Sequence, residues 1–214
     1  MSDLRRSLLK GMSNIVGDLY GTQSDEAHTV PLKPTEDQDT APKPSLPPFR
    51  KLWKTADETI DWTDILASPT PTDGLTPPEK WAMYHKYAAG VLKGDIGAYL
   101  AVLQADNPMA DLTPYVASLD VTTVNADLLR ATFAPRPDLL EKDARQYLCG
   151  MAVRTARDLM AALPILEVDV CAMQDEKPLL TVTFTRQMMN KVRFAFIDPV
   201  EFAMSCGAVI ALDA

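Results

Sequence analysis

Two carboxylates and three arginines in the C-terminal third of the sequence are the residues whose types and spacing best suit chemistry. Glu167 and Asp169 lie two apart in the stretch ILEVDVCAM. Residues two apart in a strand point to the same face of a sheet, so these carboxylates are predicted to be neighbours. Such a pair can divide acid and base roles, or it can form a charged binding rim. The simplest interpretation is a solvated outer face, with Val168 and Val170 turned into the core.

A metal-dependent site is one hypothesis for the same region. Restriction-type nucleases hold a divalent metal with an Asp near one strand and an Asp/Glu-x-Lys motif on the next. Asp169 suits the first position, but the following strand, TVTFTR, carries no carboxylate. Glu176 and Lys177 are adjacent, so they point in opposite directions in an extended segment. The pattern does not support the motif, and a metal enzyme using Asp169, Glu176 and Arg186 stays an alternative.

The three arginines are Arg154, Arg157 and Arg186. Arg154 and Arg157 are three residues apart, which places them side by side on a helix, and Asp158 lies four from Arg154. They are consistent with surface ion pairs, which contribute about 0–1 kcal/mol. Two other interpretations remain open: anchors to the acidic QDE loop or to Asp198, and a binding site for an anion.

The sequence lacks the signatures of several common chemistries. Its cysteines, Cys149, Cys171 and Cys206, are far apart and lie in apolar surroundings, which predicts buried, reduced thiols. The histidines are His28 and His85, and they form no His/Cys cluster of the kind that binds zinc. The nine glycines are scattered and form no phosphate-binding loop, and a Gly-x-Ser-x-Gly elbow is absent. We therefore expect no cofactor and no metal.

The composition and net charge of the chain argue against several classes of binding partner. The chain has 214 residues, 47% of them hydrophobic, and a net charge of −8. Sequence-independent nucleic-acid binders are usually basic, so generic nucleic-acid binding is not expected. No apolar run approaches the ~20 residues of a membrane span, and the basic N-terminus lacks the apolar core of a secretory signal. A cytoplasmic location is the resulting expectation.

The pattern divides the chain into three parts. Residues 2–20 carry the apolar stripe of an amphipathic helix, which must dock on the domain, on a partner or weakly on a membrane surface. Residues 21–48 contain six prolines and many acidic residues, and they are predicted to be a disordered linker. Residues 49–214 are predicted to form one α+β globular domain.

Helices are predicted to dominate the first part of this domain. Thr76 is expected to cap a helix that stops at Gly94, and Asp95 to cap the next one. The segment 138–163 has the strongest 3.6-residue periodicity in the chain and is predicted to be the long helix of the fold. Pro164 ends it because proline cannot continue a helix.

Strands are predicted to follow. Segments 165–173 and 178–185 alternate in polarity and are expected to form an antiparallel hairpin. Segment 121–137 is ambiguous, and 194–199 is interpreted either as a short strand or as an extended link. A final capped helix is expected within 198–207, ending at its glycine.

The C-terminal segment resembles a module at the end of uncharacterised bacterial proteins. The shared features are an arginine-rich helix, a Leu-Pro turn, a strand, a TVTF-x-R-like strand and an Ile-Asp-Pro helix start. The matching residues are Arg154, Arg157, Leu163, Pro164, Phe184, Arg186, Ile197, Asp198 and Pro199. The resemblance covers about a quarter of the chain and implies a small α+β module of unknown activity.

These observations favour a non-enzymatic intracellular binding or adaptor module. A protein partner is expected to bind the N-terminal helix or the domain surface. Among single residues, Arg154, Arg157, Arg186, Asp169 and Asp198 are the candidates for binding. The alternatives are the metal-dependent enzyme acting on nucleic acid or phosphate esters, and an acidic immunity-type protein that binds one basic partner.

Overall fold

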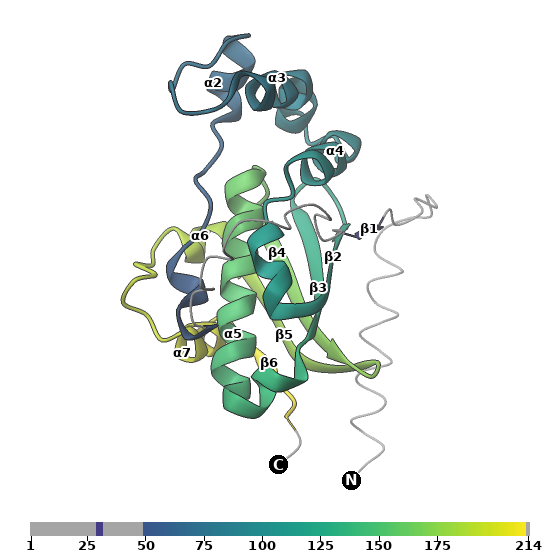
Figure 1. Cartoon of the computed structure of the whole chain (residues 1–214), viewed down its shortest axis with the longest axis vertical. Coiled ribbons are helices and arrows are strands. Elements are labelled where there is room, and N and C mark those ends of the chain that lie inside the picture. The colour runs from purple at the N-terminus through teal and green to yellow at the C-terminus, as the bar shows by residue number, and fades with distance from the viewer. Residues whose placement is uncertain (1–28, 32–48, 213–214) are drawn as a thin grey trace, which may run out of the picture.

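The protein has an α+β fold built on a mostly antiparallel sheet (Figure 1). A computed structural model describes residues 29–31 and 49–212. Its strands are β1 (Thr29–Pro31), β2 (Val116–Thr123), β3 (Leu128–Pro135), β4 (Glu167–Gln174), β5 (Lys177–Thr185) and β6 (Val209–Ile210). Its α-helices are α2 (Trp62–Ala67), α3 (Pro78–Leu92), α4 (Ile96–Asp106), α5 (Pro137–Ala162), α6 (Arg186–Met189) and α7 (Pro199–Ser205). Two 3-10 helices complete the described part: η1 (Phe49–Lys54) and η2 (Ala110–Tyr115).

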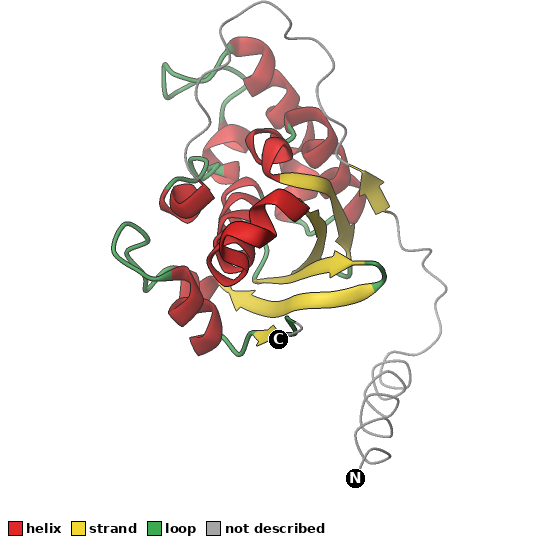
Figure 2. Ribbon diagram, turned by 60° about the horizontal axis from the view of Figure 1, so that its bottom comes forward, coloured by secondary structure: helices red, strands yellow, loops and turns green. Residues whose placement is uncertain are grey.

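The strands lie in the order β1-β2-β3-β4-β5-β6. β2 and β3 form one antiparallel hairpin, and β4 and β5 form another. β3 and β4 pair in parallel, with Leu129 opposite Val168, and α5 is the crossover that a parallel pair requires. The helices cover one face of the sheet, and the other face carries no helix among the described residues (Figure 2).

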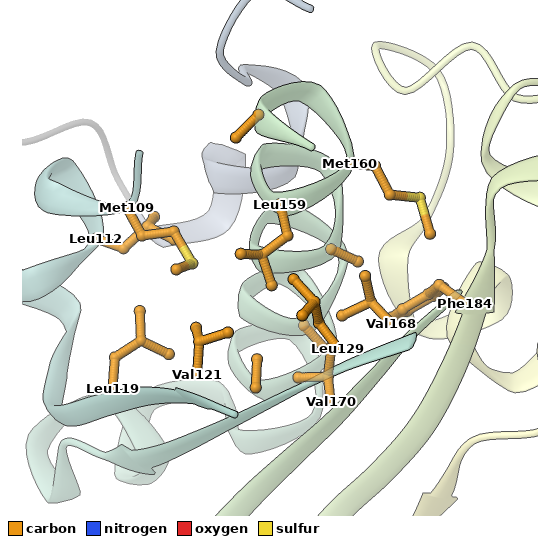
Figure 3. Close-up of a cluster of buried hydrophobic side chains, with 14 of the residues drawn as sticks. Met109, Leu112, Leu119, Val121, Leu129, Leu159, Met160, Val168, Val170 and Phe184 are labelled. Carbon is orange, nitrogen blue, oxygen red and sulfur yellow. The ribbon is translucent and has the colours of Figure 1, made fainter. Parts of the chain in front are cut away.

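The core lies between the sheet and α5. Alternate residues of β3, β4 and β5 are buried, as expected for strands with one covered face. Leu129, Val168 and Val170 point from the sheet toward α5, which carries Leu159, and Phe184 lies beside Val168 below Met160 of the same helix (Figure 3). This arrangement confirms that Val168 and Val170 face the core.

The helices α2, α3 and α4 form a group beyond the C-terminal end of α5 (Figure 1). Asp61 and Asp95 cap α2 and α4 by accepting backbone N–H groups of the first turn. The Trp62 indole donates to the carbonyl of Ala162 at 2.9 Å, and its ring meets Tyr84 edge-on with centroids 5.4 Å apart. These contacts fix the helical group onto the end of the long helix.

Several predicted elements are confirmed. The long helix expected at 138–163 is α5, although its backbone is extended at Asp143. The predicted hairpin is β4–β5. Asp198 caps the last helix, α7, and Gly207 follows it with a φ of +83°.

Other expectations need correction. The ambiguous segment 121–137 belongs mainly to the hairpin β2–β3, so the sheet is larger than one hairpin. Thr76 does not cap α3: the N-cap is Pro77, and the Thr76 hydroxyl donates to Asp73. Of the two alternatives for segment 194–199, a short strand or an extended link, the strand is wrong: the segment forms a turn at 194–196 and then leads into α7. Residues 29–31, predicted to be linker, form β1, while the rest of 21–48 and the helix predicted at 2–20 lie outside the described residues.

Candidate ligand-binding cleft

A cleft of about 670 Å³ opens where the helical group meets the end of α5. The linker between η1 and α2 forms one wall, α2 and α3 form another, and the chain from the end of α4 into η2 closes the third side. Seven carboxylates line it: Asp57, Glu58, Asp61, Asp64, Asp73, Asp106 and Asp111. The cationic side chain among the lining residues is that of Lys80.

The carboxylates differ in their partners. Asp106 pairs with Lys80 at 2.6 Å and accepts the Tyr84 hydroxyl at 2.5 Å. Asp111 pairs with Arg154 at 2.9 Å, and Asp57 lies 4.0 Å from the same guanidinium.

The other four carboxylates have no cationic partner among the described residues. Asp61 and Asp73 accept backbone N–H groups, and Asp64 accepts the hydroxyl of Thr72. Glu58 is exposed and has no side-chain partner in the described part of the chain. The cleft therefore retains a strong excess of negative charge.

The floor of the cleft is aromatic and one part of its rim is apolar. Trp81 and Tyr84 are almost fully buried, and the Trp81 indole donates to the carbonyl of Ser68 at 2.9 Å. Burial and the neighbouring Asp106 raise the pKa of the Tyr84 phenol, so it stays protonated and donates. Leu75 stands at the rim with 81% of its surface exposed.

Lys80 shows which chemistry the cleft accepts. Its ammonium pairs with Asp106 and lies 5.4 Å from the centre of the Tyr84 ring. A carboxylate beside an aromatic face binds an ammonium or guanidinium through charge and through the quadrupole of the ring. A ligand cation can reach Asp106 and the Tyr84 ring only if Lys80 moves aside. The four carboxylates without a cationic partner can bind such a cation directly.

Arg154 and Asp158 stabilise the wall nearest α5. Their side chains are 4% and 0% exposed, and Nε donates to the Asp158 carboxylate at 2.6 Å. Arg154 also donates to Thr55 at 2.7 Å, and Asp158 accepts the backbone N–H of Asp57 at 3.0 Å. Burial raises the pKa of Asp158 to about 7, although Arg154 opposes that shift. The pair thus anchors the linker that forms the wall.

Arg157 and Arg186 lie on the other side of that linker. Arg157 donates to the carbonyls of Trp53 and Thr55 at 2.5 and 3.1 Å. Arg186 donates to the carbonyls of Met160, Leu163 and Ile165 at 2.7–2.8 Å, which caps the end of α5. Within the described residues, neither arginine bonds to Asp198 or to the QDE loop, and Arg154 does not either. The structure therefore corrects the hypothesis of those particular anchors.

The remaining sequence candidates lie apart from the cleft. Asp169 accepts from Arg130 at 3.2 Å and from Thr183 at 2.8 Å on the outer face of the sheet. Asp198 accepts two N–H groups at the start of α7. Glu176 lies in the turn of the β4–β5 hairpin, beyond Gln174, which is five residues or ~17 Å of extended strand from Asp169. Asp169, Glu176 and Arg186 do not converge.

The cysteines are free, as expected, but only Cys149 is fully buried. Cys171 and Cys206 are half-buried, because Cys171 points to the uncovered face of the sheet and Cys206 ends the short helix α7. Burial raises the pKa of Cys149 to about 12, which keeps this thiol protonated and unreactive. In the described part of the chain, no three His, Cys, Asp or Glu side chains are grouped to hold a metal ion.

Sequence reasoning missed the cleft, although a signal was present. The eight residues from Asp57 to Asp64 contain four carboxylates, a density that marks a charged surface. The sequence did not show that the turn at Asp73 and the end of α4 at Asp106 meet this segment.

Comparison of the chain with protein-family models, with curated proteins and with solved structures finds no match. Within the described residues, each helix is too short or too polar to cross a membrane.

Proposed function

We propose that this chain is a non-enzymatic binding module whose acidic cleft accepts a basic segment of a protein partner. The observation that carries the proposal is the set of seven carboxylates around one cleft, four of them without a cationic partner among the described residues. Carboxylates held close together repel one another, so a ligand with Lys or Arg side chains relieves the repulsion as it binds.

The shape of the cleft supports a peptide rather than a single ion. A volume of about 670 Å³ falls within the usual range for ligand pockets, roughly 300–1,000 Å³. The exposed Leu75 and the neighbouring Pro77 offer apolar contact beside the charged rim. A segment that combines basic and apolar residues matches both features. The hypothesis of an acidic immunity-type protein is the special case in which one basic protein is the partner.

Fluorescence anisotropy with labelled hexa-arginine tests the proposal, with labelled hexa-glutamate as the peptide control. Hexa-arginine is expected to bind saturably at about 20 mM salt and to weaken steeply by about 200 mM, because exposed charges are screened. Hexa-glutamate is expected not to bind.

A matched pair of double variants locates the binding. Glu58→Gln with Asp64→Asn removes two charges from the cleft, while the new amide oxygen at position 64 can still accept the hydroxyl of Thr72. Glu141→Gln with Asp120→Asn removes two charges elsewhere: Glu141 lies 21 residues, or ~30 Å of helix, from the cleft end of α5. The cleft variant is expected to bind hexa-arginine on the order of tenfold more weakly than the control variant. Absence of saturable binding, or equal loss in both variants, overturns the proposal.

A further inference from the structure

A second, smaller cavity of about 170 Å³ lies across the linker from the acidic cleft. Arg157 of α5 and Arg186 of α6 both line it, together with Asn190 and Phe194 of the segment that follows α6. Both guanidiniums are half-buried, and neither forms a salt bridge with a carboxylate in the described part of the chain. Two cations thus share one cavity with no anion bonded to either.

We propose that this cavity is a binding site for a phosphate-type oxyanion. The arginines keep donors for such a ligand after their structural bonds are made. Arg157 uses only Nη1 toward the carbonyls of Trp53 and Thr55, which leaves its Nε and Nη2 without a hydrogen-bond partner among the described residues. Arg186 donates to backbone carbonyls through Nε and Nη2, so its Nη1 has no hydrogen-bond partner among the described residues.

The bonds already present make the site preorganised. The Arg157 guanidinium lies 4.1 Å from the centre of the Phe194 ring, and Arg186 is held by three carbonyls. A guanidinium with a fixed orientation loses little conformational entropy when it binds a phosphate, and its planar fork matches the oxygen geometry. The side chains therefore act as fixed donors, unlike arginines on an open surface.

The electrostatics favour an anion. Both arginines are half-buried, so their charges are incompletely solvated, and this burial lowers the pKa of each. Of the carboxylates nearby, Asp158 bonds to Arg154, whereas Asp57 lines the cavity, 4.0 Å from the same Arg154, and opposes the two arginines with a single negative charge. A cavity of about 170 Å³ equals the volume of several water molecules at ~30 Å³ each, so a phosphate group fits.

Substitution of either arginine would also remove bonds that stabilise the fold. Asn190→Asp avoids this problem, because Asn190 lines the cavity, is exposed and has no side-chain hydrogen bond among the described residues. The new carboxylate repels an anion without changing the arginines. Gln187→Glu is the matched control, since it adds the same charge to an exposed position of α6 outside the cavity.

Thermal unfolding of the full chain with sodium phosphate, against sodium chloride at equal ionic strength, measures the binding. A ligand that binds the folded state raises the melting temperature as its concentration exceeds Kd. The wild type and Gln187→Glu are expected to show a saturable rise, and Asn190→Asp a Kd on the order of tenfold higher. Sulfate is expected to compete and acetate to bind more weakly, because acetate carries one charge and two oxygens.

The NMR signals of the arginine Nε–H groups provide a second test. Phosphate would not shift them if the arginines had only a structural role. Phosphate is expected to shift the Arg157 Nε–H signal saturably and to leave that of Arg136 unchanged, because Arg136 Nε already donates to Asp138. Wild-type protein that melts at the same temperature in phosphate and chloride overturns the proposal. Equal phosphate affinity in Asn190→Asp and Gln187→Glu also overturns it, as the anion would then bind elsewhere.

Discussion

The pair formed by Arg154 and Asp158 gives the strongest prediction for stability. Arg154→Met removes the bond to Asp158 at 2.6 Å, the bond to Thr55 at 2.7 Å and the bond to Asp111 at 2.9 Å. It also leaves the Asp158 carboxyl group, which is 0% exposed, with no cation beside it. Breaking a buried pair by removing one partner typically costs about 3–5 kcal/mol. We expect a loss of that size in the free energy of unfolding at neutral pH.

The loss should depend on pH in a defined direction. Unfolded Asp158 loses its proton near its ordinary pKa of 3.8, whereas the folded protein keeps the proton up to about 7. The contribution of this carboxyl to stability therefore falls as the pH rises from about 4 to about 7 and is constant above. Arg154 lowers the folded pKa, so Arg154→Met raises it further. Above pH 7 the free energy of unfolding of the variant continues to fall by about 1.4 kcal/mol per pH unit, whereas that of the wild type does not.

Urea unfolding at pH 6 and pH 9, followed by tryptophan fluorescence, measures both effects. Arg145→Met on the exposed face of the same helix is the control and should change stability by less than about 0.5 kcal/mol. Replacing both partners, as in Arg154→Met with Asp158→Leu, should recover part of the loss because no buried charge remains. A cost below about 1 kcal/mol for Arg154→Met, or an equal cost at both pH values, would refute this reasoning.

Substitutions at three further positions test other parts of the fold, each by urea unfolding. Phe184→Ala empties a site with 0% exposure and should cost about 3–5 kcal/mol; a cost under about 1 kcal/mol would place this ring outside the core. Gly150→Ala puts a Cβ atom 3.0 Å from Cε3 of Trp53, so about 1–3 kcal/mol should be lost, and an unchanged midpoint would show that η1 can shift away from α5. Asp198→Ala should cost about 1 kcal/mol through the lost cap of α7, while Asp198→Asn should cost less; equal losses would argue against the cap.

The elements that the sequence predicted well are those with strong local periodicity. The helix α5 runs for 26 residues, and an apolar stripe of that length has no competing interpretation. The hairpin β4–β5 was visible because its strands alternate and are joined by a short turn. Asp95 and Asp198 were recognised as caps because capping depends on neighbours two and three residues away.

The hairpin β2–β3 was not predicted because its stability is not local. Its alternation is weak: the apolar residues Leu128 and Ala134 lie at half-exposed positions, while Thr123 and the small Ala131 occupy buried ones. β3 is fixed by parallel pairing to β4, with Leu129 opposite Val168, and 39 residues separate these partners. A single sequence carries no signal for such a pairing.

The surroundings of the arginines could not be predicted either, because they depend on residues that are far apart in the sequence. The spacing of Arg154 and Asp158 indicated an ion pair, but a surface pair and a buried pair look identical in sequence. Burial arises because η1 and η2 bring Thr55 and Asp111 to the pair from 99 and 43 residues away. Because of those contacts the pair holds the linker in place, whereas a surface pair would contribute little to stability.

That linker separates the two proposed sites, and Asp57 lines both of them. Its side chain is exposed and carries a negative charge that attracts a cation in the cleft and repels an anion in the cavity. Asp57→Asn should therefore change the two affinities in opposite directions: hexa-arginine should bind about two- to fivefold more weakly, and phosphate more tightly by a similar factor.

The backbone N–H of residue 57 still donates to Asp158 in this variant, so the linker should keep its position. Glu58→Gln is the comparison, because Glu58 lines the cleft and not the cavity. It should weaken hexa-arginine and leave phosphate unchanged. If Asp57→Asn raises or lowers the affinities for hexa-arginine and phosphate together, the substitution has shifted the linker. The idea that the charge of Asp57 acts on both sites is then wrong.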